Sequence, residues 1–339
     1  MYSVSRREIL RSSALFTLGT LSTVVLGSCG QPAANSPAGS PSGKTPLRVA
    51  LVPWVGWSSA HIADQKGFFK AEGIEVQQTI FQTVSEVNTA LLAKQVDLAW
   101  LVAVDLLVLV EKAPDLKYIY ASDYSGEVDA VIGVGSAADL KGKKIAREDV
   151  PYEVVFANKF LESAGLTEET VEVISLPVPD ATAAFVAGKV DAVVTYEPFI
   201  GKALKERPGA KVLFTAKNTN IIANGLAGSA PLLQERRNDV LAYLRALSQA
   251  MTFAQANPTA ANELIAKWVG ITPQEVAEQL PNVKLLDMTA NKTIVFNASH
   301  PLNVMQSIDA AGPILVKVGK APKALPGTSL VDDSFVKAL

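Results

Sequence analysis

The sequence predicts an α/β protein whose sheets are mainly parallel. From Thr45 onward, short apolar runs typical of buried strands alternate with segments in which apolar residues recur at helical spacing. Alternation of this kind is typical of parallel sheets, because each helix carries the chain back to the start of the next strand. An internal similarity adds to the pattern: Ala90–Ala99 aligns with Ala184–Val193, and in both segments a helix end leads through Val-Asp into a strand. Such a repeat indicates two related units, unless it reflects only the common look of helix–strand junctions.

The first predicted strand is the valine-rich run Leu47–Val52, which Pro53 ends. A loop with two tryptophans follows the strand. A helical pattern then begins at Ser58 and ends near Gly67, and a second strand begins at Ile74.

The next elements continue the alternation. Helical spacing over Val84–Lys94 leads into a short strand at Val96–Trp100, and apolar runs predict strands at Leu116–Ala121 and Ala130–Val134.

The C-terminal part is predicted to be mostly helical. Asn238–Ala256 carries apolar residues at helical spacing, and Asn257-Pro258 opens another helix that Gly270 closes. Thr272 and Glu275 have the spacing of a capping box, which indicates that a third helix begins there.

Composition narrows the possible classes of protein. A chain of 339 residues with 49% hydrophobic and 19% charged residues is globular and long enough for two cores. Residues 1–28 hold three arginines and one glutamate, so the other 28 basic and 32 acidic side chains leave a net charge of −4. This balance gives no indication of nucleic-acid binding. The single cysteine excludes an intramolecular disulfide.

Residues 1–28 have the pattern of a signal peptide, and residues 29–44 that of a flexible tether. A basic start and the apolar stretch Ala14–Leu26 lead into Leu26-Gly27-Ser28-Cys29, which is typical of a lipoprotein signal whose cysteine is acylated. The apolar stretch is shorter than the roughly 20 residues of a membrane span. Arg6-Arg7 favours twin-arginine export, although paired arginines also occur in Sec signals. We therefore expect an exported protein, periplasmic or at the cell surface, that a lipid on Cys29 anchors to the membrane.

The segment from Leu47 to Val76 resembles the N-terminal signature of substrate-binding proteins of the nitrate, sulfonate and taurine group of ABC importers. The resemblance rests on the first strand, the loop, the helix ending in Lys66-Gly67-Phe68-Phe69 and the turn before the second strand. The segment Asp139-Leu140-Lys141-Gly142-Lys143 and the final stretch Leu330–Leu339 are similar to the same group.

The resemblance implies a two-lobed, type II periplasmic binding protein fold with a ligand cleft between the lobes. Residues 45–128 and 222–339 would form one lobe, and residues 129–221 an inserted second lobe. The implied function is hinge closure on a small solute and its delivery to the permease and ATPase of an ABC transporter, by a monomer without a cofactor. A role for a sensor in place of a transporter remains an alternative.

Catalysis is disfavoured because the sequence lacks the residue patterns that it requires. The two histidines, His61 and His300, lie far apart, and the sequence has no Cys/His metal spacing, no Gly-x-Ser-x-Gly motif and no phosphate loop. A group of pyrimidine-forming enzymes shares this fold, but it depends on a histidine-rich metal site that this chain lacks. We therefore predict no enzyme activity, no cofactor and no metal.

Candidate ligand-binding residues lie in the loops that follow the strands, because ligands of open α/β sheets bind beyond the carboxyl ends of strands. The resemblance supports one of them, Glu197, whose Tyr-Glu-Pro setting matches a family position in the cleft. The predicted set is Trp54, Trp57, Ser58, Trp100, Asp105, Asp123, Tyr124, Glu148, Asp149 and Glu197.

The charges of this set favour a small organic cation such as guanidine. Aromatic faces and carboxylates suit a cation through cation–π contacts and charge-assisted hydrogen bonds, and a planar guanidinium matches a carboxylate with two bonds. The family's usual ligands are the alternative: an oxyanion or sulfonate (nitrate, bicarbonate, taurine or an alkanesulfonate), held by backbone N–H groups and by hydroxyls such as those of Ser58 and Ser59. A pyrimidine-type thiamine precursor is a further alternative.

Overall fold

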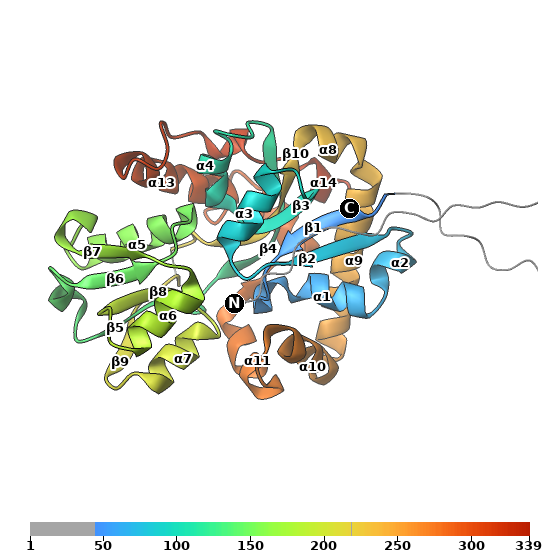
Figure 1. Cartoon of the computed structure of the whole chain (residues 1–339). Coiled ribbons are helices and arrows are strands. Elements are labelled where there is room, and N and C mark those ends of the chain that lie inside the picture. Colours follow the sequence, from blue (N-terminus) through green and yellow to red (C-terminus); the bar gives the residue numbers. More distant parts are fainter. Residues whose placement is uncertain (1–44, 218) are drawn as a thin grey trace, which may run out of the picture. The chain divides into compact units, whose positions relative to one another are not determined.

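The computed structural model describes residues 45–217 and 219–339, and it has the predicted α/β class. Two separate sheets, one of six strands and one of five, are flanked by helices (Figure 1). The predicted signal peptide and the predicted tether, with the paired arginines and Cys29, lie outside the described residues. No helix within the described ranges is long and apolar enough to cross a membrane.

The first sheet combines parallel and antiparallel strands in the order β11-β4-β10-β3-β1-β2. β1 pairs in parallel with β2 and β3, whereas β10 runs antiparallel to β3 and β4, and β11 antiparallel to β4. Its strands are β1 (Leu47–Leu51), β2 (Val76–Ile80), β3 (Leu98–Val102), β4 (Leu116–Ser125), β10 (Ala223–Ser229) and β11 (Val283–Leu285).

The second sheet is also mixed and has the order β7-β6-β8-β5-β9. β6 is parallel to β7 and β8, and β5 is antiparallel to β8 and β9. Its strands are β5 (Asp129–Val134), β6 (Lys144–Arg147), β7 (Glu172–Ser175), β8 (Ala192–Tyr196) and β9 (Ala210–Thr215).

Mainly parallel pairing was therefore too strong an expectation. The antiparallel strands lie where the chain passes between the sheets: β4 leads into β5 through 126–128, and β9 leads into β10. β5 and β10 each begin where the chain enters their sheet, next to the ends of the strands beside them (β8 and β9, and β3 and β4), so they run antiparallel to these partners. At this crossing Ser125 N donates to Ile222 O at 3.0 Å and Ala216 N donates to Asp129 O at 3.0 Å. The assignment of residues 129–221 to a separate lobe stays a prediction.

The helices cover both sheets, and the second sheet carries α5 (Pro151–Ser163), α6 (Val178–Val186) and α7 (Phe199–Glu206). The remaining helices are α1 (Ser58–Gln65), α2 (Phe68–Ala71), α3 (Val84–Leu92), α4 (Leu106–Leu109), α8 (Ala230–Glu235), α9 (Arg237–Ala256), α10 (Pro258–Val269), α11 (Pro273–Gln279), α12 (Met288–Ala290), α13 (Val304–Lys317) and α14 (Ser334–Lys337).

Local signals in the sequence set several of these helix ends. Thr272 forms the predicted capping box with Glu275, and Thr83 forms a further one with Glu86 that was not predicted. Gly270 follows α10 with a φ of 85°, a left-handed conformation that favours glycine.

The main core lies around the central strands of the first sheet. Every residue of β3 is buried, and the ring of Trp100 packs 5.8 Å from that of Trp57. Trp100 Nε1 donates to the hydroxyl of Tyr243 in α9 at 3.0 Å, and Tyr243 stacks on Phe69. These contacts fix α1, α2 and α9 against the strand ends from which the candidate site is built.

Candidate functional site

A small cavity lies between the two sheets, and we call it the inter-sheet cavity. Its volume of about 20 Å³ is enough for about one water molecule. The first-sheet side contributes Val52, Trp54, Trp57, Val84, Val102 and Asn224. The crossing and the second sheet contribute Ile222, Asp129, Tyr152 and Tyr196.

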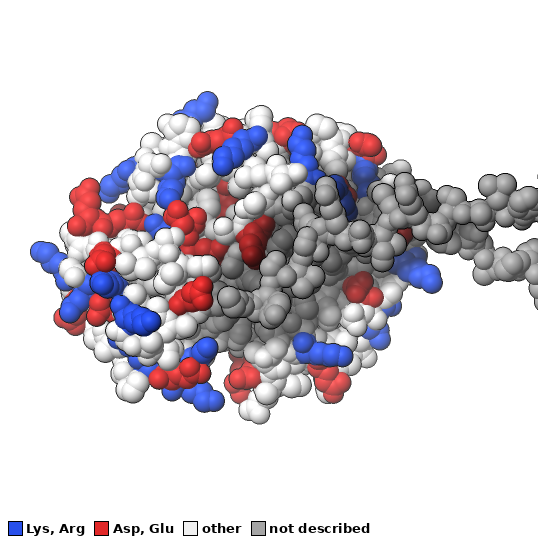
Figure 2. Space-filling view, in the orientation of Figure 1, with Lys and Arg blue, Asp and Glu red and all other residues white. Residues whose placement is uncertain are grey.

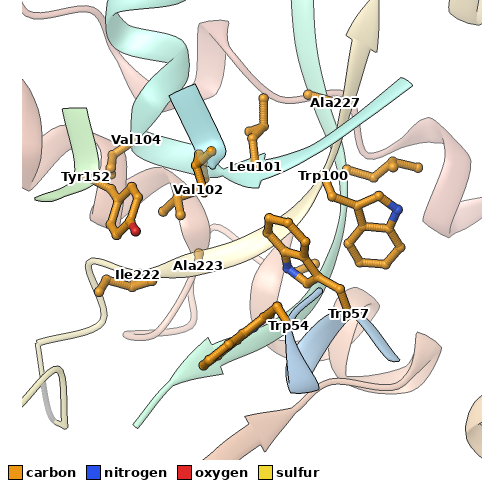
Figure 3. Packing of buried hydrophobic residues seen from close by; sticks show 14 of the residues in the cluster. Trp54, Trp57, Trp100, Leu101, Val102, Val104, Tyr152, Ile222, Ala223 and Ala227 are labelled. Carbon is orange, nitrogen blue, oxygen red and sulfur yellow. The ribbon is translucent and has the colours of Figure 1, made fainter. Parts of the chain in front are cut away.

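Aromatic rings form much of the cavity wall. Trp54 meets Tyr196 of β8 edge to face, with ring centroids 5.7 Å apart. Figure 3 shows three tryptophans gathered on one side, with Tyr152 on the opposite side. The N–H of Trp57 is buried without a hydrogen-bond partner, so this wall residue has a free donor.

The loop after β1 brings Trp54 and Asp123 together because Gly56 has no side chain. A Cβ on Gly56 would lie 2.4 Å from Asp123 Oδ2 and 2.5 Å from Trp54 Nε1, which real atoms do not tolerate. The indole N–H of Trp54 faces the Asp123 carboxylate and helps to lower its pKa, although it forms no hydrogen bond of ordinary geometry. Asp123 accepts hydrogen bonds from Asn224 Nδ2 and from Ser122 Oγ, both at 2.8 Å.

Two buried aspartates stand at the crossing between the sheets. Asp129 lines the cavity and accepts a hydrogen bond from the Ser125 hydroxyl. Burial raises the pKa of Asp129 to about 7 and that of Asp123 to about 6, because a carboxylate loses its hydration when it is enclosed. Both groups can therefore change charge near neutral pH.

Two further carboxylates join the sheets in a reciprocal manner. Asp105, which follows β3, accepts a hydrogen bond from Tyr152 N in the first turn of α5 at 2.9 Å. Glu148, which follows β6, accepts one from Ser85 N in the first turn of α3 at 3.2 Å. Each carboxylate thus binds the start of a helix that belongs to the other sheet, where the helix dipole favours negative charge.

These two carboxylates also carry raised pKa values. Burial raises the pKa of Asp105 and that of Glu148 to about 7 in each case. Glu148 Oε2 is buried without a partner. Glu153 lies beside it, accepts from Glu148 N at 2.6 Å and from the Tyr152 hydroxyl at 3.2 Å, and has a pKa that burial raises well above its ordinary value.

Positive charge is absent from the described cavity wall. Arg147 directly precedes Glu148 in the sequence, but its guanidinium pairs with Asp149 at 3.1 Å and with Glu168 at 3.2 Å. On the outer surface, basic and acidic side chains are interspersed over the described part of the face in Figure 2. The described residues also contain no group of three or more histidine, cysteine or acidic side chains placed to hold a metal ion.

The structure brings Trp54 and Trp57 of the predicted set into the cavity and places Asp105, Asp123 and Glu148 directly behind its wall.

Other predicted residues lie elsewhere. Trp100 is fully buried beneath Trp57, and the Tyr124 hydroxyl donates to Leu302 O. Asp149 is 45% exposed and pairs with Lys320 at 2.7 Å. Ser58 lines a different cavity, beside α9 and α10.

Glu197 faces a neighbouring polar groove and not the inter-sheet cavity. Its Oε2 accepts from Gly201 N at 3.2 Å and from Gln279 Nε2 at 3.5 Å, and the groove is shared with α11. Tyr196 is the last residue of β8 and lines the cavity, whereas Glu197 lies in the turn that follows the strand and contacts α7 and the groove beside α11.

Sequence reasoning left out Asp129 and Asn224 from the predicted set. Asn224 sits opposite Asp123 in the antiparallel pair of β10 and β4, and no local pattern indicates that pairing. For Asp129 a signal existed, because the expected crossing near residue 128 places the next residue at the cleft.

Three comparisons with known proteins bear on this site. A family model described as NMT1/THI5 like matches residues 58–261, more than half of the chain. A Bacillus subtilis protein described as aliphatic sulfonates-binding is 25% identical over 329 residues, which cover 92% of this chain and 92% of that protein.

Solved structures with this fold include binding proteins and an enzyme. The alkanesulfonate-binding protein SsuA of Xanthomonas axonopodis, bound to MOPS, matches with a TM-score of 0.73 and 18% identity over 86% of this chain and 100% of that one. The desulfurization enzyme DSZB matches with a TM-score of 0.61 and 14% identity over 87% of this chain and 98% of that one. At these identities the structures establish the fold alone.

Proposed function

The chain belongs to the NMT1/THI5-like family, and from that premise we propose that it is an exported solute-binding protein that delivers a small solute to the permease and ATPase of an ABC importer. The sequence resemblance to binding proteins of the sulfonate and nitrate group is confirmed by this membership and by the Bacillus relative. The cavity between two sheets, lined from both, supports a binding role.

Binding would proceed by closure of the two sheets around the solute. Asp105 and Glu148 each accept a backbone hydrogen bond across the gap. The Lys320–Asp149 pair also crosses this boundary, but both side chains are exposed, so solvent screens the pair and it contributes little to closure. The enclosed space holds about one water molecule. A solute of several atoms therefore has to enter an open state, in which residues 129–221 lie further from the other sheet. The contacts that form on closing then stabilise the bound state.

The solute that the cavity favours is a small organic cation, with guanidine as the specific candidate. The observation that carries this proposal is Asp129, a buried carboxylate on the wall, among the rings of Trp54, Trp57 and Tyr196 and without a described basic side chain. Aromatic rings bind the face of a planar cation, and a carboxylate accepts hydrogen bonds from its N–H groups. An anion would face Asp129, Asp123 and Glu148 without a compensating positive charge.

A small sulfonate or oxyanion is the second candidate, and one specific observation favours it. The N–H of Trp57 is buried and unpaired, and a donor in that state needs an acceptor. The names of the Bacillus relative and of the Xanthomonas protein refer to sulfonates. Because the pKa values of Asp129 and Asp123 lie near neutrality, protonation could remove their negative charge when such an anion binds.

Binding without catalysis is proposed in preference to an activity like that of the desulfurization enzyme. The described lining of the inter-sheet cavity contains no histidine, cysteine or serine that could act as a nucleophile or base. Asp129 is the single charged group there, and a positioned acid or base needs a partner to act on a substrate bond.

The membrane anchor is a proposal that rests on Cys29. Cys29→Ser should prevent acylation and move the protein from the membrane fraction to the soluble fraction. A variant that remains acylated and membrane-bound would disprove the lipoprotein interpretation.

A thermal-shift panel at millimolar solute tests the ligand class. Guanidinium and methylguanidine should stabilise the purified protein, whereas taurine, ethanesulfonate, nitrate and bicarbonate should not. At 100 times the dissociation constant a ligand of the native state adds about 2.7 kcal/mol to the free energy of unfolding, a shift of several degrees.

Variants locate the site within the same panel. Asp129→Asn should weaken guanidinium binding by about 2 to 5 kcal/mol, the usual cost of removing one partner of a buried charge pair. The matched control is Asp149→Asn, which removes an exposed, paired carboxylate outside the cavity and should leave binding unchanged. Stabilisation by a sulfonate, with no loss of its binding in Asp129→Asn, would establish the second candidate instead.

A further inference from the structure

A second and larger cavity lies on the other side of the Trp54 loop, and we call it the helical cavity. Its volume is about 170 Å³, and α1, α9, α10 and β4 contribute to its wall. Gly56 lines it, and Gly56 also touches the Trp54 and Asp123 side chains, which stand on the inter-sheet side. The two cavities are therefore neighbours separated by one loop and one pair of side chains.

The wall of the helical cavity is apolar at one end and hydroxyl-bearing at the other. Side chains of α1, α9, α10 and the following turn form the apolar end: Ile62, Ala250, Ala254, Ala261, Ile265 and Leu280. Ser58, Ser59 and Ser122 form the polar end, and the side-chain amides of Gln255 and Asn262 also line the wall. No charged side chain is among the described residues of this wall.

One hydroxyl at the polar end is unsatisfied. Ser59 is 7% exposed, and its Oγ is buried with no hydrogen-bond partner among the described residues. An unpaired buried polar group costs free energy that a suitable ligand recovers. Ser122 Oγ, by contrast, already donates to Asp123 Oδ2 and to Asn224 O.

We propose that the helical cavity binds a small uncharged amphiphile: an apolar body about the size of a benzene ring with one hydroxyl or carbonyl group directed at Ser59. A cavity of about 150 Å³ with apolar walls is known to stay dry and to accept benzene, and this one is of that size. Water alone fills its apolar part poorly, because a water molecule needs two to four polar partners and the side chains of Ile62, Ile265 and Leu280 offer none.

Charged ligands fit this cavity less well. A cation would find no carboxylate on the described wall, and an anion at the polar end would lie one hydrogen bond from the buried Asp123. A neutral hydroxyl can donate to or accept from Ser59 without either cost. This site goes beyond the proposed function, since it needs neither closure of the sheets nor the carboxylates of the inter-sheet cavity.

The test uses fluorinated probes, 4-fluorophenol and fluorobenzene, observed by fluorine NMR in titrations of the purified protein. Both should bind, and 4-fluorophenol should bind more tightly because it alone can pair with Ser59. Ser59→Ala should weaken 4-fluorophenol binding by about three- to tenfold, the usual worth of one neutral hydrogen bond, and should leave fluorobenzene unaffected. Ser248→Ala is its matched control, since that hydroxyl bonds within α9 and lies off the cavity.

A second variant tests the apolar end. Ala254→Leu fills part of the space and should lower the affinity for both probes at least tenfold. Ala256→Leu, on the exposed side of the same helix, should not. If Ala254→Leu fails to fold, the Ser59→Ala result decides alone. No binding of either probe, or binding that Ser59→Ala and Ala254→Leu both leave unchanged, would overturn the proposal.

Discussion

Guanidinium binding beside Asp129 should release protons from the protein. Burial raises the pKa of Asp129 from 3.8 to about 7, so at pH 6.5 about three quarters of the free protein carries a proton there. A bound cation favours the ionised carboxylate and lowers this pKa again. Binding should therefore release roughly 0.8 proton at pH 6.5. A sulfonate in the same cavity would have the opposite effect and would take protons up.

Affinity should follow the same linkage. Below about pH 6 each unit of pH should raise the guanidinium affinity almost tenfold, equivalent to about 1.4 kcal/mol, and the increase should level off above about pH 8. Titration calorimetry in two buffers of different ionisation enthalpy, at one pH, gives the number of protons directly. Asp129→Asn should reduce the release to near zero for whatever binding remains.

The control for this measurement is Asp149→Asn. The pKa of Asp149 is lowered, with its ion pairs to Lys320 and Arg147 opposing the effect of burial, so this group is already ionised at pH 6.5 and has no proton to lose. It should release protons as the unaltered protein does. Guanidinium binding with no proton exchange, or with uptake, would refute the assignment of the cation to Asp129.

Three further expectations concern closure and stability. Asp105→Ala removes the acceptor of Tyr152 N. Although Asp105 lies behind the cavity wall, this variant should weaken solute binding about tenfold in calorimetry. Asp149→Ala, which breaks an exposed ion pair, should change the affinity little, and equal effects of the two variants would contradict a role of Asp105 in closure. Gly225→Ala would place a Cβ 2.0 Å from a backbone oxygen and should lower the free energy of unfolding in urea by roughly 3 kcal/mol. Gly201→Ala in α7 would place a Cβ in ordinary contact with Glu197 Oε2 at 3.5 Å and should leave the free energy of unfolding unchanged or raise it. Tolerance of Gly225→Ala would contradict the packing of β10. The unliganded protein should lose stability as pH rises from about 4 to 7, because the pKa values of the buried carboxyl groups are higher in the folded than in the unfolded chain. Denaturation at fixed ionic strength measures this trend. A free energy of unfolding that rises over that pH range would contradict the prediction.

The elements with strong local signals were predictable from the sequence. β1 is a valine-rich run ended by a proline, α10 is bounded by Asn-Pro and a glycine, and α11 begins with a capping box. Each signal acts over a few residues, so reading it needs no knowledge of the rest of the chain.

β10 shows where such signals end. Its sequence, Ala-Asn-Gly-Leu-Ala-Gly-Ser, is rich in small residues and has neither the apolar run nor the alternation of a strand. It is a strand because β3 and β4 pair with it on both sides. Gly225 is needed there, since Tyr118 and a backbone oxygen occupy the space that a side chain would take. This is tertiary information.

The residues of the candidate site were likewise predictable only where a local rule selects them. The rule that ligands bind after the strand ends selects Trp54 and Trp57, and both line the inter-sheet cavity; their contact with a ligand stays a prediction. The rule cannot say that Glu197 contacts α7 and the groove beside α11, because that depends on how the turn after β8 packs against distant parts of the chain. It also cannot place Asn224 beside Asp123, because those residues meet only through the pairing of distant strands.

The position of β10 has a consequence for the order in which the chain folds during synthesis. β10 lies between β3 and β4, yet it is made after all five strands of the second sheet. The second sheet uses only residues 129–215 and can complete its pairing as soon as they leave the ribosome. Until residues 223–229 follow, β3 and β4 keep unpaired edges, which are open to pairing with other chains. A nascent chain stalled after residue 215 and before residue 223 has emerged therefore carries a complete second sheet and a first sheet with unpaired strand edges. Chaperone binding should be strongest to chains stalled in this interval.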